Sequence, residues 1–223
     1  MKAMILAAGH GVRMRPLTDH TPKPLLEAGG KPLIVWHIEK LAQAGFREIV
    51  INIAWLGWMI PEALGDGARW GVQLHYSDEQ AEGALETAGG IIKALPLLGD
   101  APFLIVNGDV WCDYPCLPQA PPDGFLAHLV MVPNPVQHPE GDFSLQDGRV
   151  ALNEEPRYTY SGISCYHPAF FAGTGPGKRP MLPLWQAAIA RGQVSGELYR
   201  GTWMDIGTPE RLAQLSACLA QTV

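Results

Sequence analysis

The chain has 223 residues and a formal net charge of −6 at pH 7, so it lacks the basic surface with which nucleic-acid-binding proteins neutralise phosphates. Hydrophobic residues make up 47% of the chain, but no apolar run approaches the roughly twenty residues of a membrane-spanning helix. The N-terminal apolar stretch has no small-residue cleavage site, which argues against a signal peptide. We therefore expect one cytoplasmic domain over residues 1–223, with no nucleic-acid or membrane partner.

The first predicted element is a buried strand over residues 3–8, because this apolar run is too short for a helix. Gly9 and Gly11 follow and predict a sharp turn whose main-chain N–H groups face outward. Successive outward N–H groups form a concavity that binds phosphate oxygens. Arg13 and Lys23 add positive charge nearby, so this stretch predicts a triphosphate-binding site.

Two familiar phosphate-binding motifs do not fit this turn. A Walker loop requires Lys and then Ser or Thr after its last glycine, where this chain has Val12 and Arg13. A dinucleotide fingerprint requires a third glycine three residues after Gly11, where Met14 stands. Both are excluded.

Strands and helices alternate through the rest of the chain. Further strands are predicted over residues 49–53, 72–76, 103–106, 125–132, 143–145, 150–152, 162–166 and 194–199. Helices are predicted over residues 32–44, 55–64 and 183–191. A further helix is predicted to end near Leu95, and the last one to begin after an N-cap at Thr208. The alternation is typical of a doubly wound α/β sheet, in which ligands bind at the carboxyl ends of the strands.

The four cysteines, Cys112, Cys116, Cys165 and Cys218, are scattered along the chain. A structural zinc site requires a second pair of ligands, which Cys112 and Cys116 lack. We expect all four thiols to be reduced.

Two aspartates stand where a carboxylate is better suited to binding a cation than to stabilising the fold. Asp109 follows a very apolar predicted strand, and Asp205 lies at a predicted strand-to-helix junction. Carboxylates at the edge of a sheet are suited to a hard cation. Asp205 could instead cap the last helix, but Thr208 is better placed to do so.

Residues 6–18 read Leu-Ala-Ala-Gly-His-Gly-Val-Arg-Met-Arg-Pro-Leu-Thr, and residues 22–25 read Pro-Lys-Pro-Leu. Together they resemble the signature of the sugar-1-phosphate nucleotidylyltransferases. The resemblance implies a Rossmann-like (GT-A-like), mostly parallel mixed sheet, with a nucleotide-binding half over about residues 1–110 and a sugar-binding half over about 111–223. It also implies nucleotidyl transfer from a nucleoside triphosphate to a sugar 1-phosphate, with release of pyrophosphate.

The resemblance assigns roles in the triphosphate site. Family members hold Mg²⁺ with two aspartates that match Asp109 and Asp205, so Mg²⁺ is the expected cofactor. Arg13 would stabilise the β- and γ-phosphates, and Lys23 the α-phosphoryl group. The amides of Gly11 and Val12 would assist Arg13.

The resemblance also places the base and the sugar. Ala7, Ala8 and Gly9 would form the floor under the base, with Glu82 and Gly83 at its edge. The residues implied to contact the sugar are Asn107, Asp142, Glu154, Ser161 and Gly162. One departure weakens the base assignment, because Glu86 stands where the family commonly has glycine.

Two further departures lie on the sugar side. The family often has glycine at the position of Asp142 and lysine at the position of Glu155. Because that lysine contacts the sugar's phosphate, another cation must replace it. The candidates are Arg157, Lys178, Arg179 and Arg200.

Among substrate pairs, UTP with N-acetylmuramate 1-phosphate best fits the overall likeness. Glucose or mannose 1-phosphate with UTP, dTTP or GTP remains an alternative. A non-catalytic nucleotide-sugar sensor is a third, which the retained Arg13, Lys23, Asp109 and Asp205 disfavour. We expect a monomer or a weak homo-oligomer.

Overall fold

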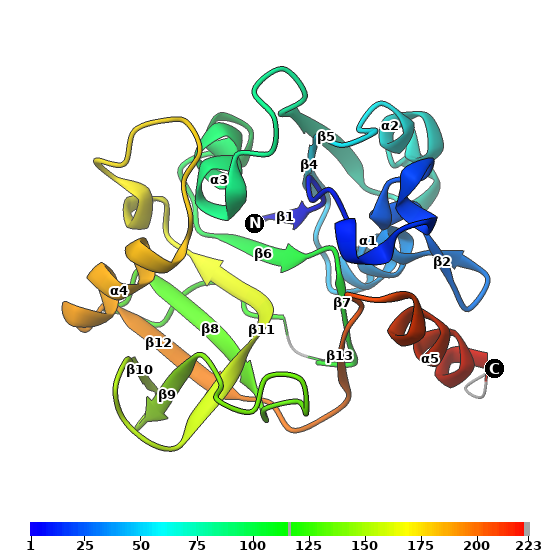
Figure 1. Cartoon of the computed structure of the whole chain (residues 1–223). Coiled ribbons are helices and arrows are strands. Elements are labelled where there is room, and N and C mark those ends of the chain that lie inside the picture. The colour runs from blue at the N-terminus through cyan, green and yellow to red at the C-terminus, as the bar shows by residue number, and fades with distance from the viewer. Residues whose placement is uncertain (116, 221–223) are drawn as a thin grey trace.

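The computed structural model describes residues 1–115 and 117–220, which fold around a nine-stranded sheet (Figure 1). Its strand order is β5-β4-β1-β6-β11-β8-β12-β10-β9. The strands are β1 (Lys2–Leu6), β4 (Glu48–Ile53), β5 (Gln73–Asp78), β6 (Phe103–Asn107), β8 (Ala127–Val132), β9 (Phe143–Gln146), β10 (Arg149–Ala151), β11 (Arg157–Tyr166) and β12 (Val194–Leu198). In this sheet β10 and β11 run against the other strands. The predicted fold class, a mostly parallel mixed sheet, is confirmed.

Helices cover both faces of the sheet (Figure 1). They are α1 (Leu33–Gln43), α2 (Met59–Leu64), α3 (Glu86–Leu98), α4 (Leu182–Ala190) and α5 (Pro209–Ala220). Short 3₁₀ turns are η1 (Val12–Met14), η2 (Leu17–Asp19), η3 (Lys23–Leu25), η4 (Ala68–Trp70) and η5 (Pro168–Phe171).

The alternation of side chains along β1 shows how the two faces are built. Ala3 and Ile5 point to the face covered by α1 and α2, while Met4 points to the face covered by α3 and α4. Because successive strand residues face opposite sides, a strand that is apolar throughout must be covered twice. The continuous apolar runs of the sequence therefore belong to the middle of the sheet.

A third apolar cluster attaches α5 to the N-terminal half. Leu212, Leu215 and Leu219 of α5 pack with Leu26 and Leu33. The Thr208 hydroxyl accepts from the backbone N–H of Arg211 at 3.4 Å, as expected of an N-cap. The last helix thus returns to the beginning of the chain.

Several predicted boundaries differ from the structure. α2 begins at Met59 rather than Trp55, because turns through Ala54, Leu56 and Gly57 come first. α3 continues through Pro96 to Leu98, although proline removes a helix donor. β11 begins at Arg157, ahead of the predicted residue 162, because its polar first half pairs with β9.

Two small sheets were not predicted from the sequence. β2 (Glu27–Ala28) pairs with β3 (Lys31–Pro32), and β7 (Val110–Cys112) pairs with β13 (Trp203–Asp205). Each strand is too short to show the alternation of apolar and polar residues by which a strand is predicted.

Cys112 and Cys165 are buried free thiols and Cys218 is exposed, whereas Cys116 lies outside the described residues. Within residues 1–115 and 117–220, no helix combines the length and apolarity needed to cross a bilayer.

Candidate active site

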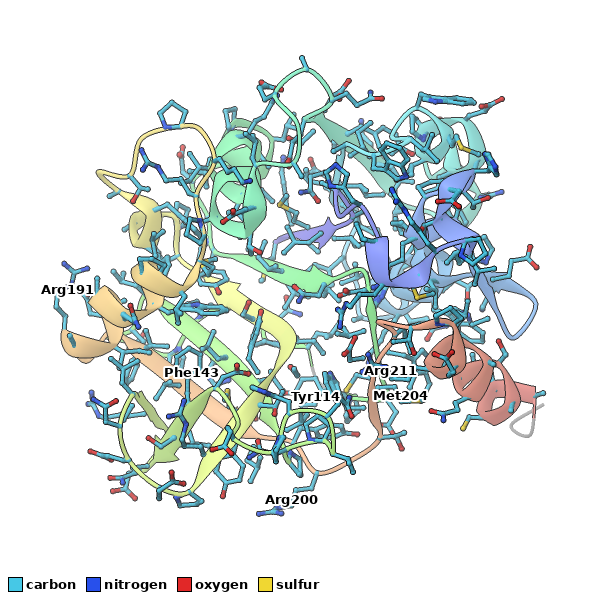
Figure 2. All side chains as sticks on the ribbon, in the orientation of Figure 1. Tyr114, Phe143, Arg191, Arg200, Met204 and Arg211 are labelled. Atoms are coloured by element: carbon cyan, nitrogen blue, oxygen red, sulfur yellow. The ribbon has the colours of Figure 1, made fainter. Side chains whose placement is uncertain are left out.

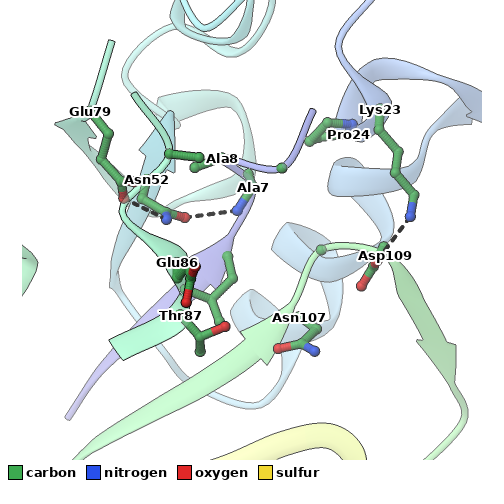
Figure 3. A pocket seen from close by; sticks show the side chains of 14 residues that line it. Ala7, Ala8, Lys23, Pro24, Asn52, Glu79, Glu86, Thr87, Asn107 and Asp109 are labelled. Atoms are coloured by element: carbon green, nitrogen blue, oxygen red, sulfur yellow. Dashed lines mark hydrogen bonds and ion pairs between the residues drawn. The ribbon is translucent and has the colours of Figure 1, made fainter. Parts of the chain in front are cut away.

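A cleft of about 240 Å³ opens at the carboxyl ends of β1, β4, β5 and β6 (Figure 3). This is where open α/β sheets bind ligands. The lining residues are Leu6, Ala7, Ala8, Gly9, Lys23, Pro24, Asn52, Glu79, Ala84, Glu86, Thr87, Asn107, Gly108 and Asp109. They include six residues predicted from the sequence, namely Ala7, Ala8, Gly9, Lys23, Asn107 and Asp109.

The glycine turn is fixed by contacts with Thr18. Gly11 has a φ of 61°, which glycine adopts readily, and a Cβ there would lie 2.8 Å from Thr18 Cγ2. The buried Thr18 hydroxyl donates to the Gly11 carbonyl at 2.8 Å, and the Thr18 carbonyl accepts from Trp55 Nε1 at 3.1 Å. The turn therefore presents Val12 and Arg13 on an exposed 3₁₀ turn at the beginning of η1.

Lys23 and Asp109 form the central ion pair of the cleft. Lys23 Nζ lies 2.8 Å from Asp109 Oδ2, and the lysine side chain is only 11% exposed against 41% for the aspartate (Figure 3). Lys23 is held in η3 between Pro22 and Pro24, and Asp109 lies in the turn between β6 and β7. The pairing places a cation where a bound phosphate could contact it directly, next to a carboxylate that could meet the same phosphate through a metal ion.

The small β7–β13 sheet brings Asp205 next to Asp109. Asp205 is the register partner of Val110, and the backbone N–H of Ile206 donates to the Asp109 carbonyl at 2.8 Å. Asp205 Oδ2 accepts from Arg211 Nη1 at 2.7 Å. Two carboxylates from distant parts of the sequence thus lie close together, Asp205 on β13 and Asp109 in the turn that leads into its partner strand β7, each with a cationic partner.

This donor set fits Mg²⁺ but does not enclose it. Among the described residues, no group of three or more His, Cys, Asp or Glu side chains could hold a metal ion. Mg²⁺ is commonly bound by one or two carboxylates together with substrate phosphates and water. Asp109 and Asp205 can supply such a pair once a phosphate is present.

His37 lies buried beneath the turn that carries Asp109. Burial is the main cause that lowers the pKa of His37 to about 4, and Lys40 lowers it further. Asp109 and hydrogen bonds with the backbone of Gly108 and Val110 oppose the shift. The imidazole is therefore neutral at neutral pH and packs against the turn through the backbone of Gly108 and Val110.

A buried polar chain, not anticipated from the sequence, crosses the other end of the cleft. Asn52 Oδ1 accepts from the Ala7 N–H at 2.8 Å, and Asn52 Nδ2 donates to Glu79 Oε1 at 2.8 Å (Figure 3). Glu79 is 0% exposed, and its Oε2 accepts from the Leu85 N–H at 2.9 Å. The chain ties the ends of β1, β4 and β5 to the beginning of α3. Asn52 lies near the end of the predicted strand 49–53 and Glu79 follows the predicted strand 72–76 by three residues, so polar side chains close to strand ends were the available signal.

Only part of the segment assigned to base recognition lines the cleft. Glu82 Oε1 lies 2.6 Å from Lys93 Nζ in an ion pair at the protein surface, and Gly83 has a left-handed φ of 73°. Neither lines the cleft, whereas the neighbouring Ala84 and Glu86 do. Glu86 has a φ of 60°, rare for a residue with a side chain, and its Oε1 lies 3.6 Å from Lys178 Nζ.

The residues assigned to the sugar form two groups. Gly162 packs against Asn107, since a Cβ at Gly162 would lie 2.9 Å from Asn107 Cβ, and the adjoining Ser161 is buried. Asp142 Oδ2 accepts from the Tyr160 N–H at 2.7 Å. Glu154 lies exposed in the loop between β10 and β11.

The four candidate cations differ in what their charged groups contact. Arg157 Nη2 donates to the Asp142 carbonyl at 2.7 Å, and Arg179 Nε donates to the Gly175 carbonyl at 3.4 Å. Arg200 lies at the outer edge of the C-terminal half (Figure 2). Lys178 is paired with the cleft residue Glu86.

The model of the family described as Nucleotidyl transferase matches residues 2–122. The chain is 51% identical to the N-acetylmuramate alpha-1-phosphate uridylyltransferase of Neisseria meningitidis serogroup B, over 97% of each chain. It is 33% identical to the enzyme of the same name from Caulobacter vibrioides, over 98% of this chain and 97% of that one.

Among solved structures, the fold is similar to a putative glucose-1-phosphate thymidylyltransferase from Bacillus anthracis. The TM-score is 0.82 at 22% identity, with 98% of this chain and 95% of that chain covered. At this identity the likeness concerns the fold alone.

Proposed function

This chain belongs to the nucleotidyl transferase family, and from that premise we propose that it transfers UMP from UTP to N-acetylmuramate 1-phosphate, forming UDP-N-acetylmuramate and pyrophosphate. The observation that carries the proposal is the 51% identity to a uridylyltransferase of this name over 97% of both chains. The proposed enzyme would act in the cytoplasm, in peptidoglycan recycling, as a monomer or a weak homo-oligomer.

The proposed reaction needs no general base. An oxygen of the sugar 1-phosphate, already anionic near neutral pH, forms a bond to the α-phosphorus of UTP. The bond from that phosphorus to the oxygen bridging the β-phosphate breaks, and its electron pair leaves with pyrophosphate. The site must therefore bring two anions together and neutralise the charge on the leaving group.

Different groups of the site are proposed to stabilise different phosphates of UTP. We assign Lys23 to the α-phosphoryl group, because it is buried at the rim and paired with Asp109 at 2.8 Å. Arg13, exposed on η1, and the main-chain amides of Gly11 and Val12 would meet the β- and γ-phosphates. Mg²⁺ held by Asp109 and Asp205 would neutralise phosphate charge during the transfer.

The base would occupy the cleft, and the sugar would lie beside it, beyond Asn107 towards β11. The floor of Ala7, Ala8 and Gly9 would take the base, next to Glu82 and Gly83. Asn107, Asp142, Glu154, Ser161 and Gly162 are proposed to contact the sugar. Lys178 is the best-supported replacement for the family lysine, because its partner Glu86 lines the cleft.

The experiment that tests the function measures pyrophosphate release with Mg²⁺, crossing UTP, dTTP, GTP and ATP with a panel of sugar 1-phosphates. The panel contains N-acetylmuramate, glucose and mannose 1-phosphates. Strong turnover with only UTP and the muramic sugar is expected. Preference for another pair would keep the reaction and overturn the substrate, whereas silence with UTP still bound would favour a sensor.

A further inference from the structure

Arg211 is a cation that the roles assigned so far do not use, although it contacts one of the proposed metal ligands. Its Nη1 lies 2.7 Å from Asp205 Oδ2, and the two side chains are only 19% and 25% exposed. Such a partly buried, charge-assisted contact is stronger than an ion pair in open water. Figure 2 shows Arg211 beside Met204 of β13, at the junction of β13 and α5.

Gly207 allows two arginines to approach the same carboxylate. A Cβ at Gly207 would lie 2.8 Å from Arg211 Nη2, 2.9 Å from Asp205 Oδ1 and 3.1 Å from Arg13 Cζ. The guanidinium groups of α5 and of the glycine turn therefore meet above this glycine, next to Asp205. A side chain at this position would separate them.

The backbone around Arg211 is fixed independently of the ion pair. The Leu212 N–H donates to the Thr208 carbonyl at 3.1 Å, and Leu212, Leu215 and Leu219 are buried in the cluster that attaches α5 to the N-terminal half. The guanidinium thus approaches Asp205 from a helix whose position does not depend on Asp205.

Both proposed metal ligands contact cations of the chain itself, Asp109 with Lys23 and Asp205 with Arg211. A free divalent cation must compete with these ammonium and guanidinium groups. A nucleotide phosphate offers them another partner, because Lys and Arg bind phosphate as readily as carboxylate.

We infer that Arg211 is a positioning residue for Asp205: it orients the carboxylate through Oδ2 and disfavours divalent metal until the nucleotide arrives. The inference rests on the proposed function in assigning Asp205 to the metal. It predicts that free metal binds the ligand-free protein weakly and that loss of Arg211 changes this.

The test titrates Mn²⁺ into the full chain and follows free Mn²⁺ by electron paramagnetic resonance, with and without UTP. Arg211→Met keeps the aliphatic stem and removes the charge. Without UTP, this variant should bind Mn²⁺ about three- to tenfold more tightly than the parent, since a competing ion pair is lost. With UTP and sugar phosphate, its kcat should fall by about tenfold, because the carboxylate is no longer oriented.

The controls separate positioning from folding. Arg191→Met, at the exposed end of α4, should bind Mn²⁺ as the parent does. Arg211→Lys should restore part of the kcat and give a smaller gain in Mn²⁺ affinity, and it serves alone if the Met variant does not fold. In an Asp205→Asn background, Arg211→Met should not change Mn²⁺ binding, because the coupled partner is absent.

Unchanged or weaker Mn²⁺ binding by a folded Arg211 variant overturns the inference, as does a gain that persists in Asp205→Asn. The Mn²⁺ titration of the ligand-free protein involves no sugar phosphate. A failure of the proposed substrate in the turnover panel is therefore distinguishable from a failure of the role of Arg211.

Discussion

In residues 1–110 the cleft is built around a fully buried polar chain, whereas two of the side chains proposed to contact the sugar in residues 111–223 lie on exposed segments. Glu79 is 0% exposed and satisfied at both oxygens. Asp142 is 37% exposed at its side chain, and Glu154 lies in an exposed loop. The family model likewise matches residues 2–122 and not the rest.

The difference indicates in which half substrate specificity can change with little loss of stability. A buried polar group that loses its partner destabilises the protein by about 1–3 kcal/mol. An exposed loop residue can be replaced with little effect on folding. Substitutions on the N-terminal side should therefore affect nucleotide use and stability together, and those on the C-terminal side should affect the sugar alone.

The largest effect is expected at the junction of the two halves. Asp109→Asn keeps the size of the side chain but removes the charge that pairs with Lys23 and would hold the metal. We expect kcat to fall by about two to four powers of ten, as for the loss of metal-held charge stabilisation. Pyrophosphate release under saturating substrates measures it.

The control for this variant is Asp100→Asn, in the exposed segment between α3 and β6. It should leave kcat unchanged. Near-normal turnover of Asp109→Asn would remove Asp109 from the proposed metal site.

The next largest effect concerns pH and His37. Its pKa is lowered from 6.5 to about 4 in the folded chain, so below about pH 6.5 the unfolded chain binds more protons. The contribution of His37 to the free energy of unfolding is therefore present above pH 6.5. It is lost as the pH falls towards 4, and the loss is about 2–3 kcal/mol.

Urea unfolding at a series of pH values from 7 to 4.5 measures this loss. His37→Gln should be less stable than the parent at pH 7 and should show a shallower decline with acid. An equally steep decline in the variant would assign the acid sensitivity to other groups.

Gly90→Ala tests the buried chain of the nucleotide side. A Cβ there would lie 2.7 Å from Glu79 Oε1 and 2.9 Å from Asn52 Nδ2, so it should break their hydrogen bond. The gain in helix propensity on replacing glycine, about 1 kcal/mol, opposes the loss. We expect a net destabilisation of about 1 kcal/mol and a KM for UTP raised by about tenfold.

Gly175→Ala provides the matched control, since a Cβ there would meet only Arg179 Nη2, at 3.9 Å. It should change neither stability nor the KM for UTP. A Gly90→Ala variant with a normal KM for UTP would show that the buried chain holds the fold and not the nucleotide.

The same difference between the halves governed what the sequence could predict. The glycine turn and Lys23 follow one apolar strand, and Asp109 follows another. Because the carboxyl ends of parallel strands meet at one edge of the sheet, the topology alone places these residues at the same edge. The pairing of β7 with β13 does not, because three-residue strands carry no period and lie far apart in the sequence. The Asn52–Glu79 and Asp205–Arg211 contacts depend on side-chain directions that only the packed structure fixes.

The smallest effect is expected on the sugar side, from Asp142→Asn. This change keeps the shape and one oxygen acceptor but removes the charge, and the backbone N–H of Tyr160 can still donate to the remaining oxygen. We expect the KM for the sugar 1-phosphate to change by about three- to fivefold, since one polar contact to the sugar and the partly exposed pair with His138 are altered. The KM for UTP and the midpoint of thermal unfolding should stay as they are in the parent.

The matched control is Asp147→Asn, in the hairpin turn between β9 and β10, where a φ of 47° is tolerated by asparagine as by aspartate. It should alter neither KM. If Asp142→Asn changed the KM for UTP as strongly as that for the sugar, the two halves would be coupled, and β11, which carries Tyr160 and pairs with β6, would connect them. Substrate specificity could then not be altered from the C-terminal half alone, because every change there would also disturb the nucleotide.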